Sequence, residues 1–303
     1  MQFDLQTTSI VSPPIGEHVP ANLYHGLGEI YAFGWAKLIG STTFRRFYQS
    51  PASFVAPPKK PEPFDIYAFG TLAHAAILEP DKLDSFMECP NWGFTAAEKK
   101  DWVAWIEKTF GAPVPPTVKN KDQIMLFANA AADKAGKSLF SAEQLSMVYG
   151  MVASVQESDE AMEMLEGSVR ERSFRAGMQK ARPDILRESE LIDLKTTAQP
   201  NRFRYHALDM LYPESLAWYE LTMARCGRIV DEWRWLVVGQ DPIAVRDDGS
   251  TIHQVDVVTA SADLREQANE RLLVALERFA ECQHTNYWPG PDTGVYTLYP
   301  RNQ

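Results

Sequence analysis

The chain has 303 residues, of which 45% are hydrophobic and 23% are charged, an ordinary composition for a soluble globular protein of one large domain. A net charge of −10 argues against a protein that covers nucleic acid with its whole surface, although it leaves room for a local basic groove. No apolar run approaches the length of a membrane span, and the first residues lack the basic and apolar regions of a signal peptide. We therefore expect a cytoplasmic protein.

The three cysteines Cys89, Cys226 and Cys282 lie far apart and form no Cys-x-x-Cys pair. This pattern argues against zinc and iron–sulfur sites and favours reduced thiols.

The first half of the chain is predicted to be mainly helical. An alanine-rich segment at 69–78 has no internal breaker and predicts a buried helix that carries His74. Before it we expect a loosely held arm at 1–23 and a proline-rich loop at 56–63. Further helical stretches are expected within 81–165, a largely helical insertion; they lie at 95–110, 121–134 and 141–165.

The second half is predicted to contain the sheet. Three short strands separated by turns come first, then a helix that Pro213 opens, two more strands and a last helix capped by Ser261. The predicted strands are 168–175, 179–186, 190–196, 233–238 and 254–259. This order fits a mixed sheet with helices on both sides and not a TIM barrel, whose strands and helices alternate regularly. We expect the sheet and its flanking helices to occupy 166–283, with a tail at 284–303.

The most informative pattern combines two acids and a lysine. Asp193 and Lys195 are two apart in a strand, so both side chains leave the same face, while Ile192 and Leu194 point into a core. Asp184 ends the preceding strand, across the turn at 187–190. Two carboxylates would then converge on a divalent cation beside an ammonium group. Such a set suits phosphodiester hydrolysis, because the metal polarises the phosphoryl oxygen and the lysine orients or deprotonates the attacking water.

Basic side chains concentrate directly before this pattern, with Glu171 as the single acid among them. Alternating arginines are typical of a solvated strand face, but their position next to two candidate metal ligands favours phosphate contacts. These basic residues are Arg170, Arg172, Arg175, Lys180 and Arg182.

The chain resembles the RecE (exonuclease VIII) family of phage-type recombination exonucleases, within the PD-(D/E)XK nuclease superfamily. The resemblance rests on Gly70-Thr-Leu-Ala-His74 followed by Glu79, on Lys180-Ala-Arg-Pro-Asp184 and on Ile192-Asp-Leu-Lys-Thr-Thr197, in this order. It implies a single nuclease domain of the α/β class with a restriction-endonuclease-like core, in which helices flank a mixed central sheet and one helical insertion is present.

The resemblance also implies an activity and partners. The activity is Mg²⁺-dependent degradation of linear double-stranded DNA in the 5′→3′ direction, which leaves 3′ single-stranded overhangs for recombination by strand annealing. A single-strand annealing partner of the RecT type, a ring-shaped homo-oligomer (a trimer or a tetramer) and a phage or prophage origin in a bacterial host are implied as well.

The family motifs assign roles to individual residues. By resemblance His74, Asp184 and Asp193 are the metal ligands, Lys195 is the catalytic lysine and Glu171 supports the site. A site of one histidine and two carboxylates would also accept Mn²⁺.

Three further positions are candidate DNA contacts. Ser215 stands where the family usually has a glutamine, four residues before a helical tyrosine, and a hydroxyl would still reach a phosphate or a water. Arg45 and Arg46 are typical of solvated helix charges, but a guanidinium also suits a terminal 5′-phosphate.

Two other functions stay open. One is a RecB-like nuclease with a different polarity or an endonucleolytic cut. The other is a catalytically inert protein that binds DNA ends during recombination. An isolated Asp-x-Lys pair is usually a surface ion pair and an isolated helical histidine is usually a core residue, so the hypothesis depends on their combination.

Overall fold

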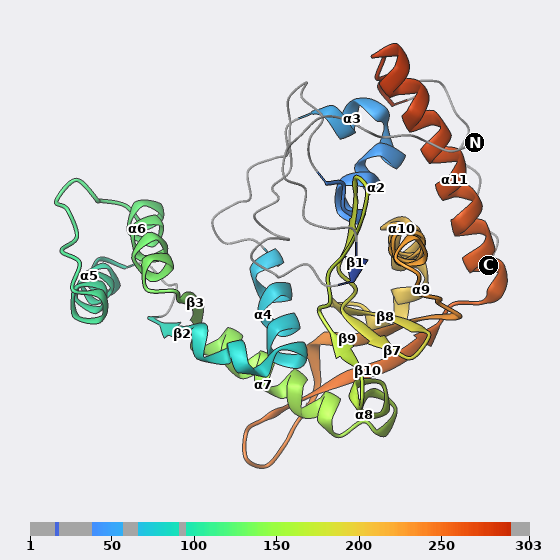
Figure 1. The fold of residues 1–303 in the computed structure, drawn as a ribbon. Helices are drawn as coiled ribbons and strands as arrows, with labels where there is room; N and C mark the ends of the chain where they lie inside the picture. The colour runs from blue at the N-terminus through green and yellow to red at the C-terminus, as the bar shows by residue number, and fades with distance from the viewer. Residues whose placement is uncertain (1–15, 18–37, 57–65, 91–94, 292–303) are drawn as a thin grey trace, which may run out of the picture.

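A computed structural model describes residues 16–17, 38–56, 66–90 and 95–291 (Figure 1). Most of the predicted arm at 1–23, most of the proline-rich loop at 56–63 and the end of the predicted tail at 284–303 lie outside the described residues. No helix in the described part of the chain is long and apolar enough to cross a membrane.

A mixed sheet of five strands forms the centre, in the order β10-β9-β8-β7-β4. Its strands β8 and β9 run parallel and the other neighbours run antiparallel, so the predicted mixed sheet is confirmed. The parallel pair is connected by the short turn η2 (Pro200–Arg202) and the helices α9 (Phe203–Asp209) and α10 (Tyr212–Arg225). The strands are β4 (Val169–Arg170), β7 (Ile185–Arg187), β8 (Glu190–Thr197), β9 (Glu232–Val245) and β10 (Thr251–Thr259).

Two of the predicted strands are each divided between two sheets, so the prediction of continuous strands at 168–175 and 179–186 was wrong. Their outer parts, β5 (Phe174–Ala176) and β6 (Gln179–Ala181), form a separate sheet with β1 (Gly16–Glu17), in the order β1-β5-β6. The breaks have local causes: Glu171 adopts a left-handed backbone with φ 51°, and Pro183 has no backbone N–H to donate. Glu171 N donates to Asp184 O at 2.9 Å, so the two breaks lie side by side.

Helices rich in aromatic residues cover one face of the central sheet. The face packs against α2 (Ser41–Gln49), α3 (Pro51–Val55), α10 and α11 (Ala262–Thr285). Phe44 stacks on Trp218 with 4.4 Å between ring centroids, and Leu191 of β8 belongs to the same buried cluster. The predicted cap of α11 is confirmed, because Ser261 Oγ accepts a hydrogen bond from Leu264 N at 3.2 Å.

The opposite face packs against α4 (Ile66–Leu78), α7 (Ala142–Gln156) and α8 (Asp159–Leu165). Here Ile192 and Leu194 are fully buried with Leu72 and Met151, which confirms that they point into a core. Because side chains alternate along β8, Asp193 and Lys195 leave the opposite face, that of Leu191, beyond the point where β7 stops pairing with β8.

A small lobe stands away from the sheet (Figure 1). It contains α5 (Ala96–Phe110) and α6 (Lys121–Lys134), whose buried side chains form a cluster around Trp102 and Ile124. A turn η1 (Pro80–Ser85) and the parallel pair β2 (Phe86–Cys89) and β3 (Ser138–Ser141) connect it to the body. The predicted helices at 95–110 and 121–134 are confirmed, but α7 and α8 pack on the sheet rather than in the lobe.

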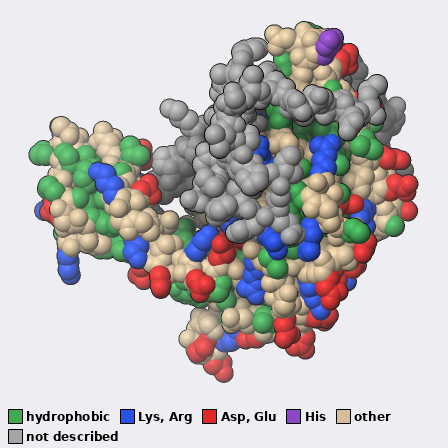
Figure 2. All heavy atoms as spheres, viewed as in Figure 1, with side chains coloured by type: hydrophobic (Ala, Val, Ile, Leu, Met, Phe, Trp, Pro, Cys, Tyr) green, Lys and Arg blue, Asp and Glu red, His purple; other side chains and the backbone are tan. Residues whose placement is uncertain are grey.

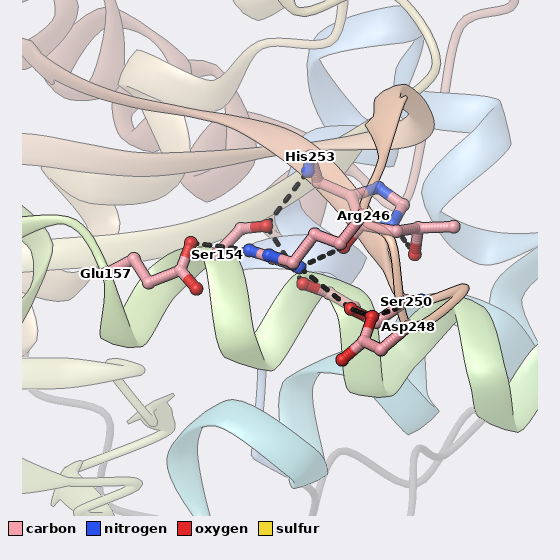
Figure 3. Close-up of polar contacts among 8 residues, drawn as sticks. Ser154, Glu157, Arg246, Asp248, Ser250 and His253 are labelled. Atoms are coloured by element: carbon pink, nitrogen blue, oxygen red, sulfur yellow. Dashed lines mark hydrogen bonds and ion pairs between the residues drawn. The ribbon is translucent and has the colours of Figure 1, made fainter.

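The hairpin of β9 and β10 is fixed to α7 by a buried polar network (Figure 3). His253 N donates to Ser154 Oγ at 2.9 Å, and its Nδ1 donates to Gly239 O at 2.9 Å. At the outer end of the same contact, Arg246 forms an ion pair with Glu157 at 2.5 Å. This network fixes the outer part of the β9–β10 hairpin against α7.

Candidate active site

The candidate site forms where β8 loses its antiparallel partner. Strand β7 pairs with β8 only as far as Ile185 opposite Ile192, so Asp184 comes next along the register, opposite Asp193. Because the chain bends at Pro183, a side chain replaces the missing strand: Asp184 Oδ2 accepts a hydrogen bond from Leu194 N at 2.7 Å. The bend therefore holds one carboxylate against the open edge of β8.

Three possible metal ligands meet at this edge. His74 comes from α4, Glu171 from the bend after β4 and Asp184 from the bend before β7. One ligand atom from each lies within 4.8 Å of the others, and His74 Nδ1 is 3.8 Å from Asp184 Oδ2. Glu171 reaches this position from a left-handed backbone, which is uncommon for a residue other than glycine and which concentrates at functional sites.

The electrostatics of this cluster fit a divalent cation. Burial, followed by the charge of Asp193, raises the pKa of Asp184 to about 8. Burial and then the charge of Asp184 raise the pKa of Glu171 to about 7. Burial and the Lys195 ammonium lower the pKa of His74, which favours the neutral imidazole that a metal binds. One imidazole and two crowded carboxylates are a donor set suited to Mn²⁺ or Mg²⁺.

Lys195 lies beside this cluster and pairs with Asp193. Its Nζ also lies 3.3 Å from Leu194 O and 5.0 Å from the centroid of the Tyr212 ring. Burial alone would lower the pKa of Lys195, but the charges of Asp193 and Asp184 outweigh it, so the pKa lies above its usual value. The side chain is therefore a charged ammonium at neutral pH, suited to charge stabilisation rather than to proton abstraction.

Asp193 lies next to the cluster of three possible ligands but is not one of its members. We expected His74, Asp184 and Asp193 as ligands, whereas the structure gathers His74 with Glu171 and Asp184. Asp193 lies next to Asp184 but is engaged by the lysine. Its role as a ligand stays a prediction, and Glu171 takes a more central position than the sequence indicated.

The predicted basic residues are mostly engaged within the protein. Arg182 Nε lies 2.5 Å from Glu171 Oε2, so the arginine forms an ion pair with one of the possible metal ligands. Arg170 donates to Leu165 O at 3.2 Å, and Arg172 is half-buried. Arg175, Lys180 and Arg182 are buried, each 9% exposed. Their contacts with DNA stay a prediction. Figure 2 shows Lys and Arg side chains towards the middle of the face, with many Asp and Glu side chains along its lower and right-hand rim.

Arg45 lies on the site side of α2. It donates to Met210 O at 3.0 Å, and its guanidinium lies 5.9 Å from the centroid of Tyr212, the ring that also faces Lys195. Arg46 instead donates to Ala56 O at 2.5 Å. Tyr212 was missed by sequence reasoning, although a large aromatic residue directly before Pro213 at a helix start was a usable signal.

Ser215 is buried within the first turn of α10. Its Oγ donates to Leu211 O at 3.3 Å, so the hydroxyl satisfies a backbone carbonyl of its own helix start. The predicted contact between Ser215 and DNA therefore requires the serine to leave this bond.

No family model and no curated protein matches the chain. The solved structures that are similar to it include the following three. A protein from Eubacterium rectale assigned as an exonuclease shares 9% identity with a TM-score of 0.47, over 87% of this chain and 91% of that chain. A phage-related exonuclease from Haemophilus somnus shares 10% identity with a TM-score of 0.31, over 84% and 98%. An alkaline exonuclease from Laribacter hongkongensis shares 13% with a TM-score of 0.23, over 62% and 96%. Residue roles therefore depend on the geometry of this site.

Proposed function

We propose that the chain is a metal-dependent exonuclease that degrades linear double-stranded DNA from its 5′ ends and leaves 3′ overhangs for strand annealing. The observation that carries the hydrolytic part is the meeting of His74, Glu171 and Asp184 within 4.8 Å, beside the Asp193–Lys195 pair. The direction of cutting and the role in recombination rest on the resemblance of the sequence motifs alone.

The ligand cluster would hold the metal through His74, Glu171 and Asp184, with Asp193 available next to Asp184. Bound there, Mg²⁺ would supply a Lewis acid for the phosphoryl oxygen and an activated water near neutral pH. The protein contributes the orientation of these ligands. Leu194 N holds the Asp184 carboxylate at 2.7 Å, and Arg182 holds Glu171 at 2.5 Å.

Lys195 would offset the negative charge that develops on the scissile phosphate. Its ammonium stays protonated because Asp193 and Asp184 raise its pKa, and the Tyr212 ring lies 5.0 Å away. Arg45, whose guanidinium lies 5.9 Å from the centroid of the same ring, would bind a terminal phosphate. A ring-shaped trimer or tetramer would keep the enzyme on its strand between cuts, and a RecT-type protein would take over the exposed strand.

The test is a nuclease assay that compares linear with closed-circular duplex DNA, with Mg²⁺ and with EDTA. We expect digestion of linear DNA only, in Mg²⁺ only, and early release of label from the 5′ ends. Early release from the 3′ ends would support the RecB-like alternative. Digestion of closed circles would contradict an exonuclease. No digestion under any condition, with end binding retained, would support the inert DNA-binding alternative.

A further inference from the structure

A cavity opens directly beyond Lys195. It has a volume of about 410 Å³ and is formed by the end of β8, the turn η2 and the helix α9. Its walls include Thr196 and Thr197, the two residues that follow Lys195 in β8. The size falls within the range of small-molecule sites, roughly 300–1,000 Å³. The metal ligands do not line it, so it is a separate site.

The lining suits a nucleotide rather than an apolar ligand. Hydroxyl and amide groups come from Thr196, Thr197 and Gln240, and Gln240 Nε2 donates to Thr196 Oγ1 at 3.2 Å. Arg202 and His206 add a guanidinium and an imidazole for a phosphate, against Asp209 as the one acid among the lining residues.

An aromatic ring is also available in this cavity. Tyr205 lines it and is 43% exposed, so its ring is accessible from the cavity. The guanidinium of Arg204 lies 4.6 Å from the ring centroid and donates to Tyr205 Oη at 2.8 Å, so the ring is held in place. A fixed and exposed ring beside cationic groups is the arrangement on which single-stranded bases stack.

The cavity is connected to the candidate active site through one residue. Tyr212 Oη lies 3.5 Å from His206 Nε2 in the cavity wall, and the Tyr212 ring faces Lys195 at 5.0 Å. A strand whose scissile phosphate lies at the metal cluster would therefore have its neighbouring nucleotide within reach of α9.

We infer that this cavity is a subsite for one nucleotide of the strand being cut, which stacks its base on Tyr205 and places its phosphate against Arg202. The inference rests on the proposed function, because it places the same strand in both sites. It also explains why an exposed aromatic residue and a cationic side chain lie together at this end of the sheet.

The test measures binding of 5′-phosphorylated hexathymidylate, labelled at its 3′ end, to the full chain in EDTA by fluorescence anisotropy. We expect the double variant Tyr205→Ala/Arg202→Ala to bind about tenfold more weakly, since stacking and a phosphate contact are lost. Tyr205→Phe should bind like the unmodified protein. The matched control Tyr287→Ala/Arg278→Ala removes an exposed tyrosine and arginine at the end of α11 and should change binding less than about twofold.

Digestion of linear duplex DNA by the same proteins separates the two proposals. If the subsite binds the strand, the double variant should raise the KM for DNA about tenfold and leave kcat within about twofold. If the unmodified protein digests DNA while the double variant binds and digests it normally, the subsite is wrong and the nuclease stands. If the unmodified protein digests no linear DNA with Mg²⁺, the proposed function fails first and the subsite with it.

Discussion

Two histidines, one beside the bend at Asp184 and one in the β9–β10 hairpin, show what distinguishes a structural polar cluster from a candidate site. Both ring nitrogens and the backbone N–H of His253 have hydrogen-bond partners. Its Nδ1 donates to Gly239 O at 2.9 Å, and its Nε2 shares a hydrogen bond with the Thr251 hydroxyl at 2.9 Å. Its backbone N–H donates to Ser154 Oγ (Figure 3). Near it, Arg246 neutralises Glu157. Burial lowers the pKa of His253.

The cluster around His74 is arranged differently. Its acids are pressed together, and burial and mutual repulsion raise the pKa of Asp184 to about 8 and of Glu171 to about 7. Like charges held together by a rigid fold cost free energy that a bound cation would recover. The comparison teaches that crowded carboxylates, rather than the presence of a histidine, mark the candidate site.

The largest expected effect comes from removing one charge of the ligand cluster. Asp184→Asn should lower kcat on linear duplex DNA about a thousandfold, or about 4 kcal/mol of transition-state stabilisation, because the amide is a poor metal ligand. The exposed Asp248→Asn should keep normal activity. Near-normal activity of Asp184→Asn would contradict the assigned site.

Lys195→Ala should have the next largest effect. We expect a loss of about 100- to 1,000-fold in kcat, because one preorganised positive charge next to the phosphate is removed. Mn²⁺ affinity, measured by calorimetry, should not fall, since the lysine is not a ligand and its charge opposes the cation. Loss of Mn²⁺ binding together with activity would show that Lys195 acts through the fold.

A substitution at the contact between α7 and the β9–β10 hairpin should lower the stability of the protein and leave its catalytic activity unchanged. A Cβ on Gly150 would lie 2.0 Å from Thr251 Oγ1 and 2.9 Å from Thr251 O, so Gly150→Ala should force the hairpin away from α7. We expect a loss of about 2 kcal/mol in the free energy of unfolding, measured with urea. Activity per folded molecule should be kept. A selective loss of kcat would contradict the distinction between the His253 network and the cluster around His74.

The smallest expected effect is a dependence of metal-free stability on pH. Folded Asp184 keeps its proton up to a pKa of about 8, whereas its usual pKa is 3.8. The folded state therefore loses stability as the pH rises towards 8, by about 1 kcal/mol between pH 7 and 9. Saturating Mn²⁺ should remove this loss, and Asp184→Asn should abolish it. Metal-free protein that is equally stable at both pH values would contradict the crowding of the acids.

The sequence predicted the parts of the site that local patterns encode. The helix of His74, the strand of Asp193 and Lys195 and the cap at Ser261 each follow from spacing within a few residues. The backbone of Glu171 could not be predicted, because its left-handed conformation is stabilised by a hydrogen bond to Asp184, which lies across the bend. The position of Tyr212 over Lys195 likewise depends on packing between α10 and β8.

The errors in the fold have the same origin. Strands β2 and β3 are four residues each and pair in parallel across the whole lobe, so neither carries a local periodicity. The two broken strands read as continuous because both halves are strand-like, and only the separation of the two sheets shows the break. That break brings Glu171 and Asp184 together, so the least predictable feature of the fold builds the candidate site.

The most direct test of this account is the position of Mn²⁺ in a crystal of the protein, located from its anomalous scattering. We predict a peak enclosed by His74 Nδ1 and the carboxylates of Glu171 and Asp184, with Lys195 outside its coordination shell. A peak at another cluster, or full Mn²⁺ occupancy at this place in Asp184→Asn, would contradict it.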